Sequence, residues 1–367
     1  MTNVVFYGTI RHKPLLEVVV GDLSHLDLSD ISLPGYAARR IAGEDYPVLV
    51  PEDGATETGL LVEGLTDADL SRIVYYDSAF GCALTELALE GTTALFFVSE
   101  RRNLELADRW SLEIFEKTRA EMTCLAAREV MGYIGRKSPE QVNRMFPMIR
   151  ARAASRLRAE RAPRRGGRFE GHVEIEDRTR EYADFFALDD MQLRHERFDG
   201  TMTERLGRAV FIAADAALVL PYDPVRDRVL LVEQLRMGPL ARDDRQCWQF
   251  EPIAGRIDDV ETPEHAVRRE AREEAGLELG ALHRVAEVYP TPGTSTEFYY
   301  LYVGIADLPD GAGGHGGLDA EHEDIRSHVI AFDALLELCD TAQAANAPLV
   351  MAAYWLARHR ERLRGEA

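Results

Sequence analysis

The sequence has few cysteines and no spacing that would group them. Four occur among 367 residues, far apart and without a C-x-x-C pair, at Cys82, Cys124, Cys247 and Cys339. Structural zinc sites and disulfide frameworks need cysteines at close, regular spacing. The pattern therefore argues against both and favours four reduced thiols in a cytoplasmic protein.

Long apolar segments are also missing. The longest apolar run, from Ala209 to Leu220, is interrupted by Asp215 and is too short to span a bilayer. The first residues show no apolar stretch behind a basic start, so no signal peptide is predicted. We therefore expect no membrane partner and a cytoplasmic location.

Positive charge is scarce relative to negative charge. Lysine and arginine total 43 against 63 aspartate and glutamate residues, which gives a formal net charge of −20. A general nucleic-acid-binding protein would normally be basic, so that class of function is disfavoured. A polyanionic substrate would have to be met by local arginine, lysine or metal ions.

The length and a hydrophobic content of 46% predict two packed domains of mixed α/β (α+β) character. Residues 1–100 resemble a mixed domain with short strands. Residues 101–165 are expected to be helical, chiefly from Leu104 to Ile134 and after the N-cap Ser138, and to end in a basic linker. That linker could contact phosphate, although a solvated connection is the simpler reading.

The remaining residues, 166–367, are expected to form the second domain. Two strands are predicted around a turn at Pro221–Pro224, a helix over Pro263–Glu274, and a mobile glycine-rich loop at Asp310–Gly317. The predicted strands are Ala216–Leu220, Val229–Val232, Phe298–Val303 and His328–Ala331.

The predicted helix of the second domain carries an unusual set of carboxylates. Glu270, Glu273 and Glu274 stand at i, i+3 and i+4, so they share one face. They repel one another, and they lie in the last turn, where the helix dipole disfavours negative charge. Hard divalent cations would compensate, because Mg²⁺ takes oxygen ligands and commonly bridges carboxylate to phosphate. A solvated acidic face is the alternative for an isolated E-x-x-E-E.

The surrounding sequence favours the metal site. The segment from Gly255 to Leu277 reads GRIDDVETPEHAVRREAREEAGL and matches G-x₅-E-x₇-R-E-U-x-E-E-x-G-U, where U is an apolar residue, at every fixed position. It resembles the Nudix box of the Nudix hydrolases. The resemblance implies an α/β/α sandwich and Mg²⁺ or Mn²⁺ as cofactor. It assigns Glu270, Glu274 and the main-chain carbonyl of Ala254 as metal ligands. Glu273 would assist, Arg269 would hold the glutamates in place, and Glu261 would support the loop.

The flanking sequence indicates the type of Nudix hydrolase. Pro292 follows the box, and several nearby segments, such as Trp248–Gly255 and Leu318–Val329, resemble the ADP-ribose pyrophosphatase branch over about residues 180–360. This implies hydrolysis of ADP-ribose to AMP and ribose 5-phosphate. Glu321 would be the general base and Glu323 a further metal ligand. The substrate would be met by Arg236, Arg208, Glu251, Glu297 and Phe185. Proteins of this branch are domain-swapped homodimers, so Phe185 and Arg208 would come from the partner.

Three alternatives stay open at this point. The substrate could be another nucleotide sugar such as GDP-mannose, because Pro292 alone does not decide between them. The chain could bind ADP-ribose without cleaving it, although such regulators commonly lose box glutamates that are present here. For Phe185 and Trp248, a place in the core is as consistent with the sequence as a place in the site.

The first domain resembles a second family. Val4–Arg11, with Tyr7-Gly8-Thr9, is similar to the first strand and turn of gamma-glutamylcyclotransferase-like proteins, where the turn holds a carboxylate. That family has a catalytic glutamate at the position of Phe80, and phenylalanine cannot transfer a proton. A binding or structural role is therefore expected. The combination of domains resembles bacterial Nudix proteins associated with tellurite resistance, a phenotype that specifies no chemistry.

Overall fold

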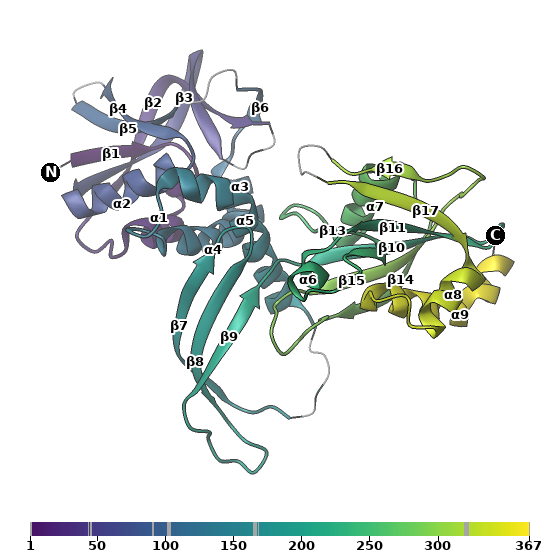
Figure 1. Ribbon diagram of the computed structural model, residues 1–367. Coiled ribbons are helices and arrows are strands. Elements are labelled where there is room, and N and C mark those ends of the chain that lie inside the picture. The colour runs from purple at the N-terminus through teal and green to yellow at the C-terminus, as the bar shows by residue number, and fades with distance from the viewer. Residues whose placement is uncertain are drawn as a thin grey trace. The chain divides into compact units, whose positions relative to one another are not determined.

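The computed structural model describes residues 2–42, 44, 46–89, 92–100, 104–163, 167, 169–318 and 323–366. The chain forms two compact units, Met1–Arg161 and Ala162–Ala367, and both combine helices with sheets, as predicted (Figure 1). The helical segment expected to connect the domains lies inside the first unit. All four cysteines are free thiols. No helix within the described ranges has the length and apolarity needed to cross a membrane.

The first unit is built on one mixed sheet. Within its described residues the strand order is β4-β5-β1-β3-β2-β6, and β1 runs antiparallel to β3 and parallel to β5. The strands are β1 (Thr2–Phe6), β2 (Asp27–Ile41), β3 (Pro47–Leu65), β4 (Cys82–Leu89), β5 (Thr92–Ser99) and β6 (Leu106–Arg109). The helices are η1 (Thr9–Arg11), α1 (Lys13–Val20), α2 (Asp67–Ser78), α3 (Leu112–Thr118), α4 (Ala120–Met131) and α5 (Pro139–Arg161).

The expected helix from Leu104 to Ile134 is wrong at its beginning. Leu106–Arg109 form β6, which pairs with β2 through Ile41 and Arg39. This short segment is a strand because a distant strand supplies its hydrogen-bonding partners, which local spacing cannot reveal. Helix α5 begins at Pro139 as predicted. Gln141 N–H donates to Ser138 Oγ at 3.3 Å, and Ser138 N–H donates to Gln141 Oε1 at 2.8 Å, a reciprocal cap.

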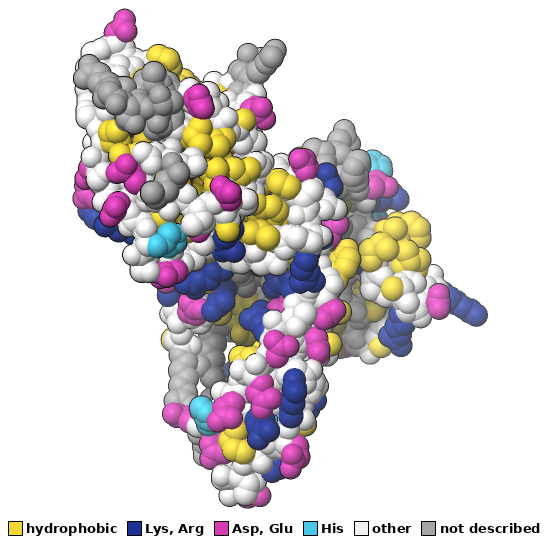
Figure 2. Space-filling model, turned by 90° about the vertical axis from the view of Figure 1, so that its left-hand side faces the viewer, with side chains coloured by type: hydrophobic (Ala, Val, Ile, Leu, Met, Phe, Trp, Pro, Cys, Tyr) yellow, Lys and Arg dark blue, Asp and Glu magenta, His cyan; other side chains and the backbone are white. Residues whose placement is uncertain are grey.

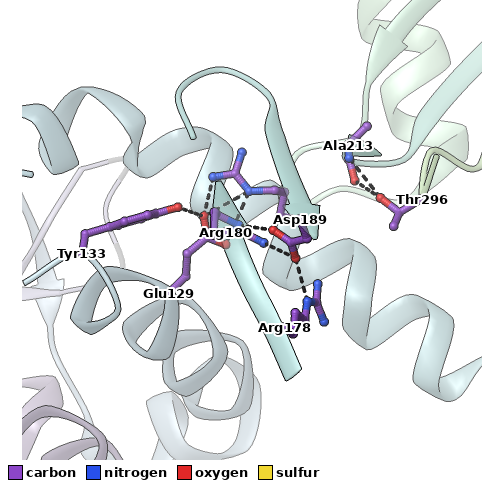
Figure 3. Close-up of polar contacts among 8 residues, drawn as sticks. Glu129, Tyr133, Arg178, Arg180, Asp189, Ala213 and Thr296 are labelled. Carbon is purple, nitrogen blue, oxygen red and sulfur yellow. Dashed lines mark hydrogen bonds and ion pairs between the residues drawn. The ribbon is translucent and has the colours of Figure 1, made fainter. Parts of the chain in front are cut away.

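Helices α4 and α5 are joined by a carboxylate. Glu129 of α4 accepts a hydrogen bond from Tyr133 Oη at 3.0 Å (Figure 3). It accepts another from Arg152 Nε of α5 at 3.2 Å. The Arg152 side chain is 3% exposed, and the ion pair with Glu129 neutralises its buried charge.

The second unit contains a separate antiparallel sheet of β7 (Val173–Ala183), β8 (Ala187–His195) and β9 (Leu206–Ile212). Asp189 of β8 is buried and accepts hydrogen bonds from Arg178 Nε at 2.6 Å and Arg180 Nε at 2.7 Å (Figure 3). Burial raises the pKa of Asp189, but the two guanidinium groups more than offset it and hold the pKa below its usual value. Acidic and basic side chains lie side by side over this sheet (Figure 2).

The main sheet of the second unit has eight strands among the described residues. Its order is β14-β15-β10-β11-β17-β16, with β12 paired to β11 and β13 to β10. The strands are β10 (Ala216–Asp223), β11 (Arg228–Leu235), β12 (Trp248–Glu251), β13 (Ile253–Arg256), β14 (Leu282–Val288), β15 (Tyr299–Ile305), β16 (Gly314–Gly316) and β17 (Ile325–Ala331). The helices are α6 (Met237–Ala241), α7 (Pro263–Ala275), α8 (Phe332–Asp340) and α9 (Ala347–Gly365).

Helices cover both faces of this sheet, which confirms the predicted α/β/α sandwich (Figure 1). Leu218 and Leu220 of β10 pack with residues of α8 and α9. Ala217 and Val219 point to the opposite side and pack with α7. Successive residues of a strand point to opposite faces, so a continuous apolar strand here builds two cores.

Two local expectations in this unit were wrong. The strand β10 continues through Pro221 and Tyr222, and the turn follows Asp223, whose Oδ1 accepts from the N–H groups of Val225 and Arg226, both at 2.9 Å. Part of the expected glycine-rich loop, Gly314–Gly316, forms β16 and pairs with β17. Pairing with β17, rather than the glycine-rich composition, sets the conformation of Gly314–Gly316.

Candidate active site

Helix α7 carries the box glutamates, and its ends are as predicted. Thr262 Oγ1 accepts from His265 N–H at 3.2 Å, Pro263 opens the helix, and Gly276 ends it in the left-handed conformation at φ 62°. Three fully buried residues fix the helix to the sheet: Ala266, Val267 and Ala271. This packing fixes which face of α7 the glutamates occupy.

Glu270 and Glu274 are buried rather than solvated, at 9% and 2% exposure. The solvated acidic face considered for these residues is therefore excluded. The backbone of β13 passes directly against Glu270. The approach is so close that a Cβ atom on Gly255 would lie 1.7 Å from Glu270 Oε1. Any other residue at position 255 would force the Glu270 carboxylate to move, since its Cβ would occupy the position of that carboxylate.

Arg269 organises three carboxylates. Its Nη1 donates to Glu270 Oε1 at 2.7 Å and to Glu273 Oε2 at 2.9 Å. Its other nitrogens donate to Glu261 at 2.9 and 3.0 Å and to the Arg256 carbonyl at 3.1 Å. Hydrogen bonding to Glu261 and the nearby carboxylates raises the pKa of Arg269. The arginine thus ties the box loop to the glutamate face of α7.

The two buried glutamates are short of positive charge. Burial raises the pKa of Glu270 to about 7, with Arg269 opposing the rise and the charges of Glu273 and Glu323 adding to it. Burial also raises the pKa of Glu274 to about 9, and the charges of Glu270 and Glu323 add to this rise. Glu274 Oε2 is buried and makes no hydrogen bond to any described residue.

The segment around β16 packs on the end of α7. A Cβ on Gly316 would lie 1.9 Å from the Glu274 carbonyl oxygen, and Gly317 N–H donates to the Glu273 carbonyl at 3.2 Å. Gly317 has φ +94°, and Glu323 Oε2 accepts from the Leu318 N–H at 3.2 Å. This packing brings Glu323 close enough to Glu270 and Glu274 for their charges to interact. The predicted base, Glu321, lies outside the described residues.

A second polar group lies beside Glu274. Arg236 Nε donates to both carboxylate oxygens of Glu251, at 2.9 and 2.8 Å, and its charge influences Glu274. Glu297 accepts from Tyr299 Oη at 3.2 Å. Burial raises the pKa of Glu297. The hydrogen bond from Tyr299 and the charge of Arg236 partly oppose this rise. The predicted Arg236, Glu251 and Glu297 therefore form one electrostatic group.

The predicted aromatic and arginine residues on the flanks differ in position. Phe185 and Trp248 are 54% and 55% exposed within the chain, so neither is a core residue. The guanidinium of Arg256 lies 5.8 Å from the centre of the Phe185 ring, which places Phe185 beside the box strand. Arg208 is exposed on β9, where it donates to the Gly207 carbonyl at 2.8 Å. In the described part of the chain, Arg208 makes no hydrogen bond or ion pair with the box glutamates.

The donor set fits a divalent cation in its chemistry. Glu270 and Glu274 are adjacent and buried, and among the described residues one oxygen of Glu274 has no hydrogen-bonding partner. Hard cations take carboxylate and carbonyl oxygens of this kind. Residues 2–318 and 323–366, apart from the shorter gaps, hold no group of three or more His, Cys, Asp or Glu side chains already arranged around one point. Arg269 holds Glu270 and Glu273 through ion pairs.

Sequence reasoning missed two residues of the site. Arg256, which lies over Phe185, occupies an unfixed position of the box pattern. Tyr299, which donates to Glu297, reads only as part of an apolar strand. Alternation along β15 could have indicated that Tyr299 and Leu301 share a face, but not that a carboxylate lies there.

Comparison with known proteins gives matches over the second unit. The model of the Nudix domain matches residues 213–352. The ADP-ribose pyrophosphatase of Escherichia coli (strain K12) is 38% identical over 194 residues, which are 53% of this chain and 92% of that protein. The GDP-mannose pyrophosphatase of Escherichia coli O9:H4 (strain HS) is 29% identical over 167 residues, 46% of this chain and 85% of that protein. A solved structure described as an ADP compounds hydrolase covers 53% of this chain and 96% of its own, at 19% identity and a TM-score of 0.41.

Proposed function

The chain belongs to the Nudix hydrolases and is a Nudix diphosphatase, and on that premise we propose that it hydrolyses ADP-ribose to AMP and ribose 5-phosphate with Mg²⁺ or Mn²⁺. The observation that carries the proposal is the buried pair Glu270 and Glu274: Arg269 holds Glu270, while Glu274 Oε2 is buried without a hydrogen bond to any described residue. The similarity to an ADP-ribose pyrophosphatase over 92% of its length supports this choice of substrate.

The residues of the chain have separate parts in this reaction. Glu270, Glu274, the Ala254 carbonyl and Glu323 would hold the cation, which supplies positive charge for the diphosphate oxygens. Arg269 keeps the box glutamates oriented through its hydrogen bonds to Glu270 and Glu273. Glu321 would accept the proton of the attacking water, as a carboxylate near a cation can do.

The substrate would lie between two groups of residues. Arg236 would contact phosphate or sugar oxygens, since a guanidinium suits such contacts. Hydrogen bonds to Glu251 hold the Arg236 side chain in place. Phe185 would stack on the adenine ring, and its exposed ring beside Arg256 leaves a face for this contact. Glu297 and Arg208 would complete the binding residues.

The test of this proposal is a product analysis. Full-length protein incubated with ADP-ribose and Mg²⁺ should release AMP and ribose 5-phosphate in equal amounts. Excess chelator should stop the release, and added Mn²⁺ should restore it. Full activity in excess chelator, or release of adenine or free phosphate in place of AMP, would contradict the proposal.

A second substrate has specific support. A GDP-mannose pyrophosphatase matches 46% of this chain at 29% identity, so another nucleotide sugar could occupy the same site. The two candidates share the diphosphate and differ in base and sugar. The choice therefore rests on the residues that contact the base, chiefly Phe185, rather than on the glutamates.

We also propose an assembly and a role for the first unit. The three-stranded sheet and the turn between β7 and β8 carry several exposed apolar residues that a second copy would cover, in a homodimer through the Nudix domain: Val173, Ile175, Tyr182, Phe186, Leu188 and Phe211. Residues 1–100 would form a gamma-glutamylcyclotransferase-like domain without cyclotransferase activity, since Phe80 replaces the acid. The absence of 5-oxoproline release from gamma-glutamyl amines would support this role, and clear release would overturn it.

A further inference from the structure

The last residue of strand β13 is an arginine to which the proposed reaction assigns no part. Arg256 stands directly after Gly255, at a position of the box pattern that any residue can occupy. Side chains alternate along a strand, and at Gly255 the side-chain direction is toward Glu270 of α7. The Arg256 side chain therefore points away from α7, to the side of the strand that carries the side chain of Ala254.

The backbone of Arg256 is held at two points. In the pairing of β13 with β10, Arg256 lies opposite Ala216. Its carbonyl accepts a hydrogen bond from Arg269 Nη2 at 3.1 Å, and Nη1 of the same arginine donates to Glu270 and Glu273. The point from which the Arg256 side chain extends is therefore fixed relative to the glutamate face of α7.

The Arg256 side chain extends to an aromatic ring. Its guanidinium carbon lies 5.8 Å from the centre of the Phe185 ring, which is within the range of a cation–π contact. Arg256 Nη2 lies 3.5 Å from Asp258 Oδ1, in an ion pair between two partly exposed side chains. The guanidinium thus contacts both a carboxylate of the box loop and the ring that is proposed to stack on the base.

Other aromatic rings hold Phe185 from a second side. Its ring centre lies 4.8 Å from that of Phe186, edge to face, and the Phe186 ring centre lies 4.8 Å from that of Phe211. The Phe211 N–H donates to the Thr294 carbonyl at 2.8 Å, which ties this group of rings to the loop after the box. Phe185 is still 54% exposed, so its contacts with Arg256 and Phe186 leave ring surface for a ligand.

Phe185 lies in the turn between β7, which ends at Ala183, and β8, which begins at Ala187. An exposed side chain in such a turn loses rotamer freedom when it stacks on a ligand, and this loss weakens binding. We propose that Arg256 is a positioning residue for the base of the nucleotide, with its guanidinium holding the Phe185 ring where the exposed ring surface can stack on the purine. The inference rests on the proposed function, which takes Phe185 as the ring that stacks on the base.

Binding of two matched probes to the full-length protein with Mg²⁺ tests this role. AMP is ribose 5-phosphate with adenine attached, so the pair differs only in the base. Arg256→Met should weaken AMP binding by about 3- to 5-fold, the scale of a cation–π contact at an exposed site, and leave ribose 5-phosphate binding unchanged. Arg256→Lys keeps a cation near the ring and should recover part of the loss. Arg284→Met, at a side chain 62% exposed on β14, is the matched control and should bind AMP as the parent does.

A double-mutant cycle shows whether Arg256 acts through the ring. In a Phe185→Leu protein, Arg256→Met should cause no further loss of AMP affinity, because the ring that the arginine holds is gone. With ADP-ribose as substrate, Arg256→Met should raise KM and leave kcat close to that of the parent. Parent-like AMP binding by Arg256→Met, an equal loss with and without the ring, or an equal loss for ribose 5-phosphate would overturn the inference. AMP binding by a parent protein that leaves ADP-ribose uncleaved would contradict the proposed function alone, and a parent that binds no AMP would contradict both.

Discussion

Gly255 and Glu270 occupy adjoining space, so that a side chain on the first would coincide with the carboxylate of the second. The Cβ of any other residue at position 255 would lie 1.7 Å from Glu270 Oε1 and 1.9 Å from its carboxyl carbon. The first glycine of the box therefore allows β13 to approach α7 without displacing Glu270. It fixes where the buried carboxylate can stand.

The variant Gly255→Ala should displace Glu270 and lower kcat/KM by about 100-fold, the scale associated with misplacing a reacting group by about 1 Å. Crowding should also cost about 1–3 kcal/mol of stability. Steady-state kinetics and urea unfolding measure the two effects. Gly365→Ala, which has open space around its Cβ, is the control and should behave as the parent. An unimpaired Gly255→Ala enzyme would show that Glu270 does not act from this position.

The variant Glu274→Gln should lose more than about 100-fold in kcat, because metal-supplied charge stabilisation is worth several kcal/mol. It should remain folded, since it removes one of several clustered like charges from a buried site. Kinetics with Mg²⁺ and unfolding in chelator test both statements. Glu278→Gln, at a side chain 77% exposed beyond the helix, is the matched control. Full turnover by Glu274→Gln would refute the metal site.

Two glutamates that follow β16, Glu321 and Glu323, are expected to have different functions. Glu321→Gln should lower kcat far more than it raises KM, because proton transfer belongs to the transition state. Glu323→Gln should instead raise the Mg²⁺ concentration needed for half-maximal rate, since Glu323 lies near Glu270 and Glu274. Titrations of metal at saturating substrate distinguish these effects. Parent-like behaviour of both variants would place the base and this ligand elsewhere.

The sequence predicted helix α7 well because its signals are local. Thr262 and Gly276 lie at the ends of the helix they were expected to cap, and Arg269 meets the glutamates next to it in sequence. Local signals failed at Leu106–Arg109, where the strand exists because β2 pairs with it. The spacing of apolar residues alone could not reveal that partner.

The parts of the site that depend on distant contacts could not be predicted. No pattern shows that Gly316 lies against the Glu274 carbonyl or that Arg256 lies over Phe185, because both pairs are made by packing of separate elements. The burial of Asp77 in the first unit is of the same kind. Its Oδ2 atom is buried without a hydrogen bond to any described residue, which became visible only once α2, α4 and α5 were placed around it.

Asp77 should also give the protein a measurable pH dependence of stability. Burial raises its pKa from 3.8 to about 8, so the folded state holds this proton more tightly than the unfolded chain does. The stabilisation that comes from this tighter proton binding is complete below about pH 4 and is lost as the pH rises to about 8. Asp77→Asn should therefore stabilise the first unit by about 1–3 kcal/mol at pH 9 and have little effect at pH 4. Denaturant unfolding at both pH values measures this, and destabilisation at pH 9 would show that the carboxylate has a partner.

Hydrolysis of ADP-ribose by the second unit can be measured in competition with a second nucleotide sugar. Full-length protein with Mg²⁺ is given equal concentrations of ADP-ribose and GDP-mannose, and early release of AMP and GMP is quantified in the same reaction. The ratio of the two products equals the ratio of the kcat/KM values, whatever fraction of the enzyme is active. AMP is expected to exceed GMP by at least ~10-fold. GMP in excess, or neither product, would contradict it.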